Sequence, residues 1–162
     1  MLFRPLPIFL TLALLAGATG LPVTSAFADD MWQVKTSGSF VTLRYGPLNE
    51  RERASFLLSC LNGIGIAVLS VNMDFPEMET GEALTIEFSA GDKTAPVAGE
   101  TAAEDGTGII YGEAGDIAVK PILKVLEQKG PVTMKSGANA MELSDVGRAE
   151  SVAEFAKECP LD

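Results

Sequence analysis

Four carboxylates crowd one short stretch of the chain, "NMDFPEMETGE": Asp74, Glu77, Glu79 and Glu82. Loops rich in carboxylate oxygens suit hard cations such as Ca²⁺, which takes roughly six to eight oxygen ligands. The spacing matches neither an EF-hand nor a nonapeptide calcium-binding repeat, and Pro76 restricts the loop. The stretch is therefore a candidate calcium site, but a solvated acidic loop is the favoured interpretation, because runs of like charge are usually solvated.

Two methionines, Met73 and Met78, flank the same acidic stretch. Thioether sulfur is a ligand for copper, and exported copper-handling proteins use it. Methionine is also a common filler of core gaps. Since the chain contains no histidine to complete a copper site, we expect both methionines to pack against the core.

The absence of histidine also limits catalysis, because it removes the usual general base near neutral pH and the commonest transition-metal ligand. The chain contains none of the motifs GxSxG, SxxK or HExxH. We therefore predict no catalytic residue and no cofactor other than the calcium discussed above. A carboxylate-based hydrolase of envelope glycans or peptides is the enzymatic alternative, since two facing carboxylates are sufficient for glycoside hydrolysis.

The chain has two cysteines, Cys60 and Cys159. Cys159 follows Phe155 by four residues on the apolar stripe of a predicted C-terminal helix. Cys60 alternates with Phe56 and Leu58 on one face of a predicted strand. Both thiols are thus expected to point into the core, and a pair of cysteines in an exported chain predicts a disulfide. There is no CxxC motif, so a structural bond is favoured over a redox or metal site.

The first 28 residues have the layout of a secretory signal peptide. Arg4 precedes an apolar run over residues 8–18, and Ala26-Phe27-Ala28 provides small residues for cleavage. The run is about half of the ~20 residues that cross a bilayer, so a retained membrane helix is less favoured. We expect cleavage after Ala28, a periplasmic location, and a single globular domain over residues 29–162 without membrane insertion.

The chain is acidic, with 12 basic and 22 acidic residues and a formal net charge of −10. The predicted signal peptide removes one basic and no acidic residue, which leaves 11 against 22 and a charge of −11. Such a surface repels phosphate backbones and anionic headgroups, so we predict no nucleic-acid partner.

Apolar and polar residues alternate through most of the first two thirds of the chain. Strands are predicted over residues 39–46, 54–60, 64–73 and 83–89, followed by a hairpin over 91–115. The hairpin turns at Asp105-Gly106, and Pro96 in its first arm predicts that this arm lies at a sheet edge.

The hydrophobic period then becomes helical. Ile122, Val125 and Leu126 predict a helix that Gly130-Pro131 ends, and "VTMKSGANAMELSD" predicts two short strands before the C-terminal helix. The fold class is α+β: an antiparallel sheet or flattened β-sandwich with two late helices, the second tied to the sheet by the disulfide. An all-β sandwich with two short helices is the close alternative.

One further feature has a surface interpretation. "LNERER" clusters Glu50, Arg51, Glu52 and Arg53, which predicts local surface ion pairs. Taken together, the sequence favours an exported, non-enzymatic domain that binds an envelope protein or a small ligand. The hydrolase and the divalent-cation-binding protein are the alternatives.

Overall fold

The computed structural model describes residues 30–49, 53–61, 66–73, 75 and 77–159. The predicted signal peptide at 1–28 and Asp74 lie outside these residues. Within them, no helix is long and apolar enough to cross a membrane.

The described residues form nine strands and two helices. The strands are β1 (Met31–Ser37), β2 (Phe40–Gly46), β3 (Phe56–Leu61), β4 (Ile66–Val71), β5 (Ala83–Ala90), β6 (Lys93–Ala103), β7 (Ile110–Gly115), β8 (Val132–Ser136) and β9 (Asn139–Leu143). The helices are α1 (Val119–Leu126) and α2 (Arg148–Glu158). The predicted strands, the hairpin and the two late helices are all present at their expected places.

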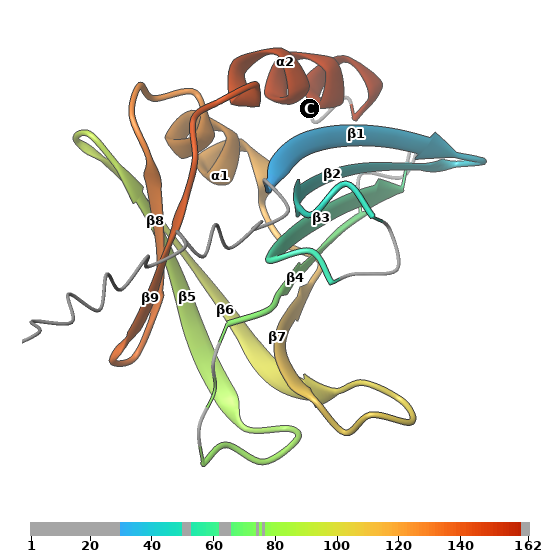
Figure 1. Cartoon of the computed structure of the whole chain (residues 1–162), viewed down its shortest axis with the longest axis vertical. Coiled ribbons are helices and arrows are strands. Elements are labelled where there is room, and N and C mark those ends of the chain that lie inside the picture. The colour runs from blue at the N-terminus through green and yellow to red at the C-terminus, as the bar shows by residue number, and fades with distance from the viewer. Residues whose placement is uncertain (1–29, 50–52, 62–65, 74, 76, 160–162) are drawn as a thin grey trace, which may run out of the picture.

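All nine strands belong to one antiparallel sheet, ordered β1-β2-β3-β4-β7-β6-β5-β8-β9. The sheet curves into a half-barrel, and both helices lie at one end of it (Figure 1). The predicted antiparallel α+β architecture is therefore confirmed. The flattened sandwich describes it only approximately, because the strands form one continuous sheet rather than two.

Period-two alternation gives the sheet two distinct faces. In β3, Phe56, Leu58 and Cys60 are buried, whereas the residues between them are partly exposed. We call the buried side the inner face and the opposite side the outer face. The inner face holds the core, and it also carries Phe88 of β5, whose ring meets that of Phe56 edge to face at 5.7 Å.

The two helices cover the inner face. Helix α1 contacts β5 and β6, and α2 contacts β1 and β2. Val152 and Phe155 of α2 are buried as the apolar stripe predicts, whereas Ala156 is exposed. Helix α2 ends at Glu158, so Cys159 is its C-cap rather than a helical residue.

The predicted disulfide between Cys60 and Cys159 is present, with the two Cα atoms 5.9 Å apart. It joins the inner face of β3 to the end of α2, and both cysteines are buried. A hydrogen bond also connects the two edges of the sheet. The indole Nε1 of Trp32 in β1 donates to the carbonyl oxygen of Ser144, just after β9, at 2.7 Å.

One strand prediction is wrong. The arm that contains Pro96 is β6, which lies between β5 and β7 rather than at an edge. Pairing with β7 covers only Glu100 to Ala103, however, whereas Pro96 pairs with Glu87 of β5. Proline is tolerated there because this part of β6 has a strand partner on one side only.

Candidate functional site

A groove of about 810 Å³ lies on the outer face of the sheet. We call it the outer groove. Its lining residues come from β1, β2, β3, β4, β6 and β7 and from the segments before β3, after β4 and after β6: Lys35, Ser37, Thr42, Arg44, Arg53, Ala54, Leu57, Ser70, Asn72, Ala103, Glu104, Asp105 and Tyr111. The groove is thus separate from the core, and most of its lining side chains are polar or charged.

Strand register aligns the floor of the outer groove. Arg44, Leu57 and Ser70 are direct partners across β2, β3 and β4. Because each is flanked by inner-face residues, all three project from the outer face. Arg44 is only 6% exposed, which is unusual for a charged side chain and shows how closely its neighbours surround it.

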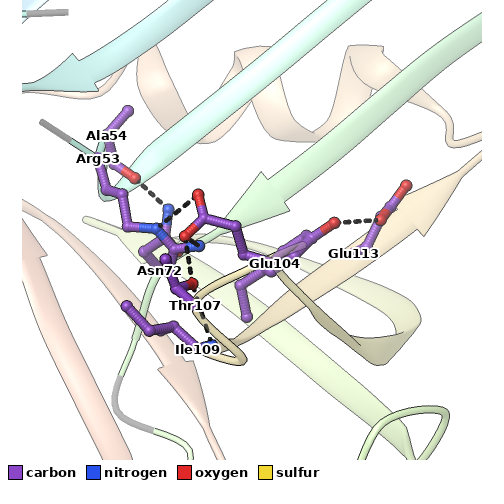
Figure 2. Close-up of polar contacts among 8 residues, drawn as sticks. Arg53, Ala54, Asn72, Glu104, Thr107, Ile109 and Glu113 are labelled. Atoms are coloured by element: carbon purple, nitrogen blue, oxygen red, sulfur yellow. Dashed lines mark hydrogen bonds and ion pairs between the residues drawn. The ribbon is translucent and has the colours of Figure 1, made fainter. Parts of the chain in front are cut away.

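An ion pair forms one wall of the groove (Figure 2). Arg53 Nη2 lies 2.8 Å from Oε2 of Glu104, and Arg53 Nε donates to Oε1 at 3.3 Å. The hydroxyl of Thr107 donates to the same Oε2 at 2.6 Å. The hydrogen bond from Thr107 and then that from Arg53 hold the pKa of the Glu104 carboxyl below its ordinary value. Glu104 is therefore an ionised acceptor at neutral pH.

Tyr111 lies beside this ion pair. The guanidinium carbon of Arg53 is 6.0 Å from the centroid of the Tyr111 ring, at the outer limit of a cation–π contact. The Tyr111 hydroxyl donates to Oε2 of Glu113 at 3.0 Å. Burial, and next the hydrogen bond to Glu113, raise the pKa of the Tyr111 phenol. The phenol stays protonated at neutral pH and acts as a hydrogen-bond donor.

Asn72 fixes the short segment that carries Arg53. Its Nδ2 donates to the carbonyl oxygen of Ala54 at 2.6 Å, and its backbone N–H donates to that of Ser55 at 3.0 Å. Its Oδ1 is buried and has no hydrogen-bond partner among the described residues. The segment is also tied to β2, because the Ser55 N–H donates to the Tyr45 carbonyl at 2.9 Å.

Gly46 allows this segment to approach β2 closely. A Cβ at Gly46 would lie 2.7 Å from the Ala54 Cα and 3.4 Å from Nη2 of Arg44. The first distance is shorter than any ordinary carbon–carbon contact, so only glycine fits. The same geometry places the Arg44 guanidinium next to Ala54, the residue that follows Arg53.

The outer groove concentrates positive charge on an acidic protein. Its lining contains three basic residues, Lys35, Arg44 and Arg53, and two acidic ones, Glu104 and Asp105. The whole chain has a formal net charge of −10. The groove can therefore hold polar or anionic groups that most of the surface repels.

The predicted calcium loop is organised by its own hydrogen bonds. Oε1 of Glu82 accepts from the Glu79 N–H at 3.0 Å, and the Thr101 hydroxyl donates to the Glu79 carbonyl. Glu77 is exposed, and Asp74 lies outside the described residues. Over the described ranges, no group of three or more candidate ligands converges. Calcium binding stays a prediction that the structure does not test.

The two methionines beside this loop are placed as expected. Met73 is buried in the core, and Met78 is partly buried and packs against it.

Most residues of the outer groove were missed by sequence reasoning. Arg53 was expected to form a local ion pair, but its partner Glu104 is 51 residues away. Residues 50–52 of the same cluster lie outside the described residues. One available signal was Arg44, the one charged residue in the strand sequence "FVTLRYG".

Comparisons with family models, with curated protein sequences and with solved structures found no significant match.

Proposed function

We propose that this protein is an exported binding domain and that the outer groove holds a small polar ligand. The observation that carries the proposal is the groove itself: about 810 Å³, on the face opposite the core, with a buried arginine in its floor. Ligand sites commonly occupy roughly 300–1,000 Å³, and most are lined by apolar side chains. The polar lining here favours a polar ligand.

The chemistry of the groove suits binding better than proton transfer. Glu104 has a lowered pKa and Tyr111 a raised one, so neither changes its charge near neutral pH. General acid–base catalysis needs a group whose pKa lies near the working pH. The fixed charges and donors of the groove instead provide stable hydrogen-bond partners for a ligand.

Export is supported by the disulfide. Such bonds persist in oxidising compartments such as the periplasm and are rare in the cytosol. Together with the signal-peptide pattern of residues 1–28, the bond favours a periplasmic location. The intact mass of the protein recovered from its host would test this, with loss of residues 1–28 and of two hydrogens as the expected result.

An envelope protein is the second candidate for the bound partner. On the same outer face, Phe40 and Ile66 are 51% and 43% exposed, and both pair with Leu61. Phe40, Leu61 and Ile66 thus form an apolar row across β2, β3 and β4. The next outer-face pair along β1 and β2 is Lys35 and Thr42, which lines the groove. A partner segment that covers the row would place its polar end in the groove.

A groove-filling substitution tests the proposal. Ser70→Tyr places a ring in the floor of the groove, and strands accept tyrosine readily. Thr85→Tyr is the matched control, on an exposed position of β5 outside the groove. We expect small polar compounds that raise the melting temperature of the wild type and of Thr85→Tyr to lose this effect on Ser70→Tyr. Equal shifts in all three proteins would contradict the proposal.

A further inference from the structure

The Arg53 guanidinium already binds a carboxylate in the groove, that of Glu104. Two nitrogens on one edge of the guanidinium, Nη2 and Nε, meet the two carboxylate oxygens, at 2.8 and 3.3 Å. This two-point contact is the arrangement that makes arginine selective for planar, bidentate anions. The Arg53 guanidinium is therefore oriented to contact a carboxylate at two points.

We propose that the natural ligand carries a carboxylate that displaces Glu104 from Arg53. The inference rests on the proposed function and adds to it the chemical class of the ligand. Glu104 then acts as an internal competitor, which occupies the guanidinium until a ligand arrives. It does not bind the ligand.

The exposure of the pair allows this exchange. The Arg53 and Glu104 side chains are 28% and 40% exposed, so solvent and ligands reach both. Exposed ion pairs contribute little to stability, so a ligand has little to overcome. Glu104 also keeps a partner after displacement, because the Thr107 hydroxyl donates to it from within the same turn.

Arg53 keeps its place when Glu104 leaves. The Asn72 side chain holds the adjoining Ala54 carbonyl at 2.6 Å, and the Tyr111 ring lies beside the guanidinium. A guanidinium that is fixed in advance loses less conformational freedom when it binds a ligand. The Arg44 guanidinium, next to Ala54, adds a second positive charge nearby.

Calorimetric titration of the oxidised protein tests the inference. The probes are acetate, succinate, glutarate and citrate, with dimethyl glutarate as the uncharged analogue and inorganic phosphate as a non-carboxylate anion. Glu104→Gln removes the competing charge and retains an acceptor for Thr107. Because an exposed ion pair contributes little, we expect this variant to bind the best carboxylate about two- to fivefold more tightly than the wild type, and Arg53→Gln to bind at least roughly tenfold more weakly.

The chain offers a matched control pair. Lys93 and Asp92 form an exposed ion pair, with Nζ 3.0 Å from Oδ2, and neither residue lines the groove. Asp92→Asn and Lys93→Gln remove the same charges as the two test variants, so they show the effect of net charge alone. We expect both controls to bind as the wild type does. Circular dichroism of each variant confirms that it is folded.

The outcomes separate the inference from the proposed function. Weaker or unchanged binding by Glu104→Gln overturns the displacement of Glu104. Equal binding of dimethyl glutarate, or binding of phosphate alone, overturns carboxylate recognition. In either case, the groove stays the binding site if the compound that binds raises the melting temperature of the wild type but not that of Ser70→Tyr. If no carboxylate binds the wild type or Glu104→Gln, while other polar compounds bind in the groove, only the ligand class is wrong.

Discussion

Arg53 and Glu104 are 51 residues apart in the chain, and a two-point ion pair joins them across the outer face of the sheet. Arg53 precedes β3, whereas Glu104 follows β6, so the contact depends on the pairing of β4 with β7. That pairing brings the β6–β7 turn close to the start of β3. The ion pair can therefore form only when the sheet, and with it the outer groove, is assembled.

The first prediction concerns the pH dependence of this contact. Glu104 has a lowered pKa in the folded protein, so its ionised form is favoured by folding. Its contribution to stability is complete above the ordinary carboxyl pKa of about 4.3 and is lost as the pH falls through the lowered value. We expect the melting temperature of Glu104→Gln to be slightly below that of the wild type at pH 7. The two melting temperatures should become equal once the pH falls below the lowered pKa of Glu104.

Thermal unfolding of both proteins between neutral and acid pH measures this effect. The effect is small because the side chain is exposed to solvent. A gap between the two melting temperatures that widens toward acid pH would show that the sign is wrong.

The second prediction concerns Gly46. Gly46→Ala forces a Cβ to within 2.7 Å of the Ala54 Cα, so the segment before β3 must move away from β2. We expect a loss of stability of about 1–3 kcal/mol, as for overpacking in a dense region, together with weaker ligand binding. Gly115→Ala is the control, because nothing lies within 4 Å of a Cβ built there. Equal unfolding free energies for the two variants would contradict the close approach.

The third prediction concerns the disulfide. It links residues separated by 99 positions, and a loop of that length corresponds to about 4–5 kcal/mol in the chain-entropy model. We expect reduction to lower the free energy of unfolding by an amount of this order and to loosen α2 first. In urea titrations, the double variant Cys60→Ala/Cys159→Ala should be insensitive to reductant. A wild type that is equally insensitive would show that the bond contributes nothing.

The fourth prediction concerns Arg148, the first residue of α2. It is 2% exposed, and its guanidinium donates to the carbonyl oxygens of Leu126 and Gly130, at 2.8 Å each, and of Gln128. Arg148 thereby closes the end of α1 and the loop that follows it. Arg148→Met leaves these buried acceptors unpaired, and we expect a loss of about 2–4 kcal/mol.

Lysine does not restore the three contacts, because its single ammonium lacks the planar array of donors. We therefore expect Arg148→Lys to be destabilised nearly as much as Arg148→Met. Lys157→Met, at an exposed position of the same helix, is the control. Urea unfolding of the three variants measures the difference, and similar stability of Arg148→Met and Lys157→Met would argue against a capping role.

Eight of the nine strands and both helices were predicted, because each buries one face; β1 was not among the predicted strands. Alternation at Phe56, Leu58 and Cys60 identified β3, and its inward cysteine identified the disulfide. The stripe at Val152 and Phe155 identified α2 in the same way. These signals are local, because the period of the hydrophobic residues follows directly from the geometry of a strand or a helix.

The order of the strands was not predictable from such signals. The β4–β7 and β5–β8 pairs join strands that are not neighbours in the chain, so no turn sequence specifies them. The outer groove depends on the first of these pairs and on outward-facing polar positions, which have no hydrophobic period. The wrong placement of Pro96 at a sheet edge has a related cause. Its strand lies inside the sheet, and proline fits there because this part of the strand pairs with β5 only.

The most direct test of the outer groove as the binding site is a nitrogen-15 correlation spectrum of the oxidised protein titrated with glutarate and citrate. We expect saturable shifts of backbone amides that cluster around Arg44, Arg53, Ser70 and the turn after β6, with α1 and α2 unchanged. Saturable shifts confined to the helices or to the 77–82 loop would contradict the assignment of the groove. So would the absence of any saturable shift with glutarate, with citrate and with the small polar compounds of the melting-temperature test.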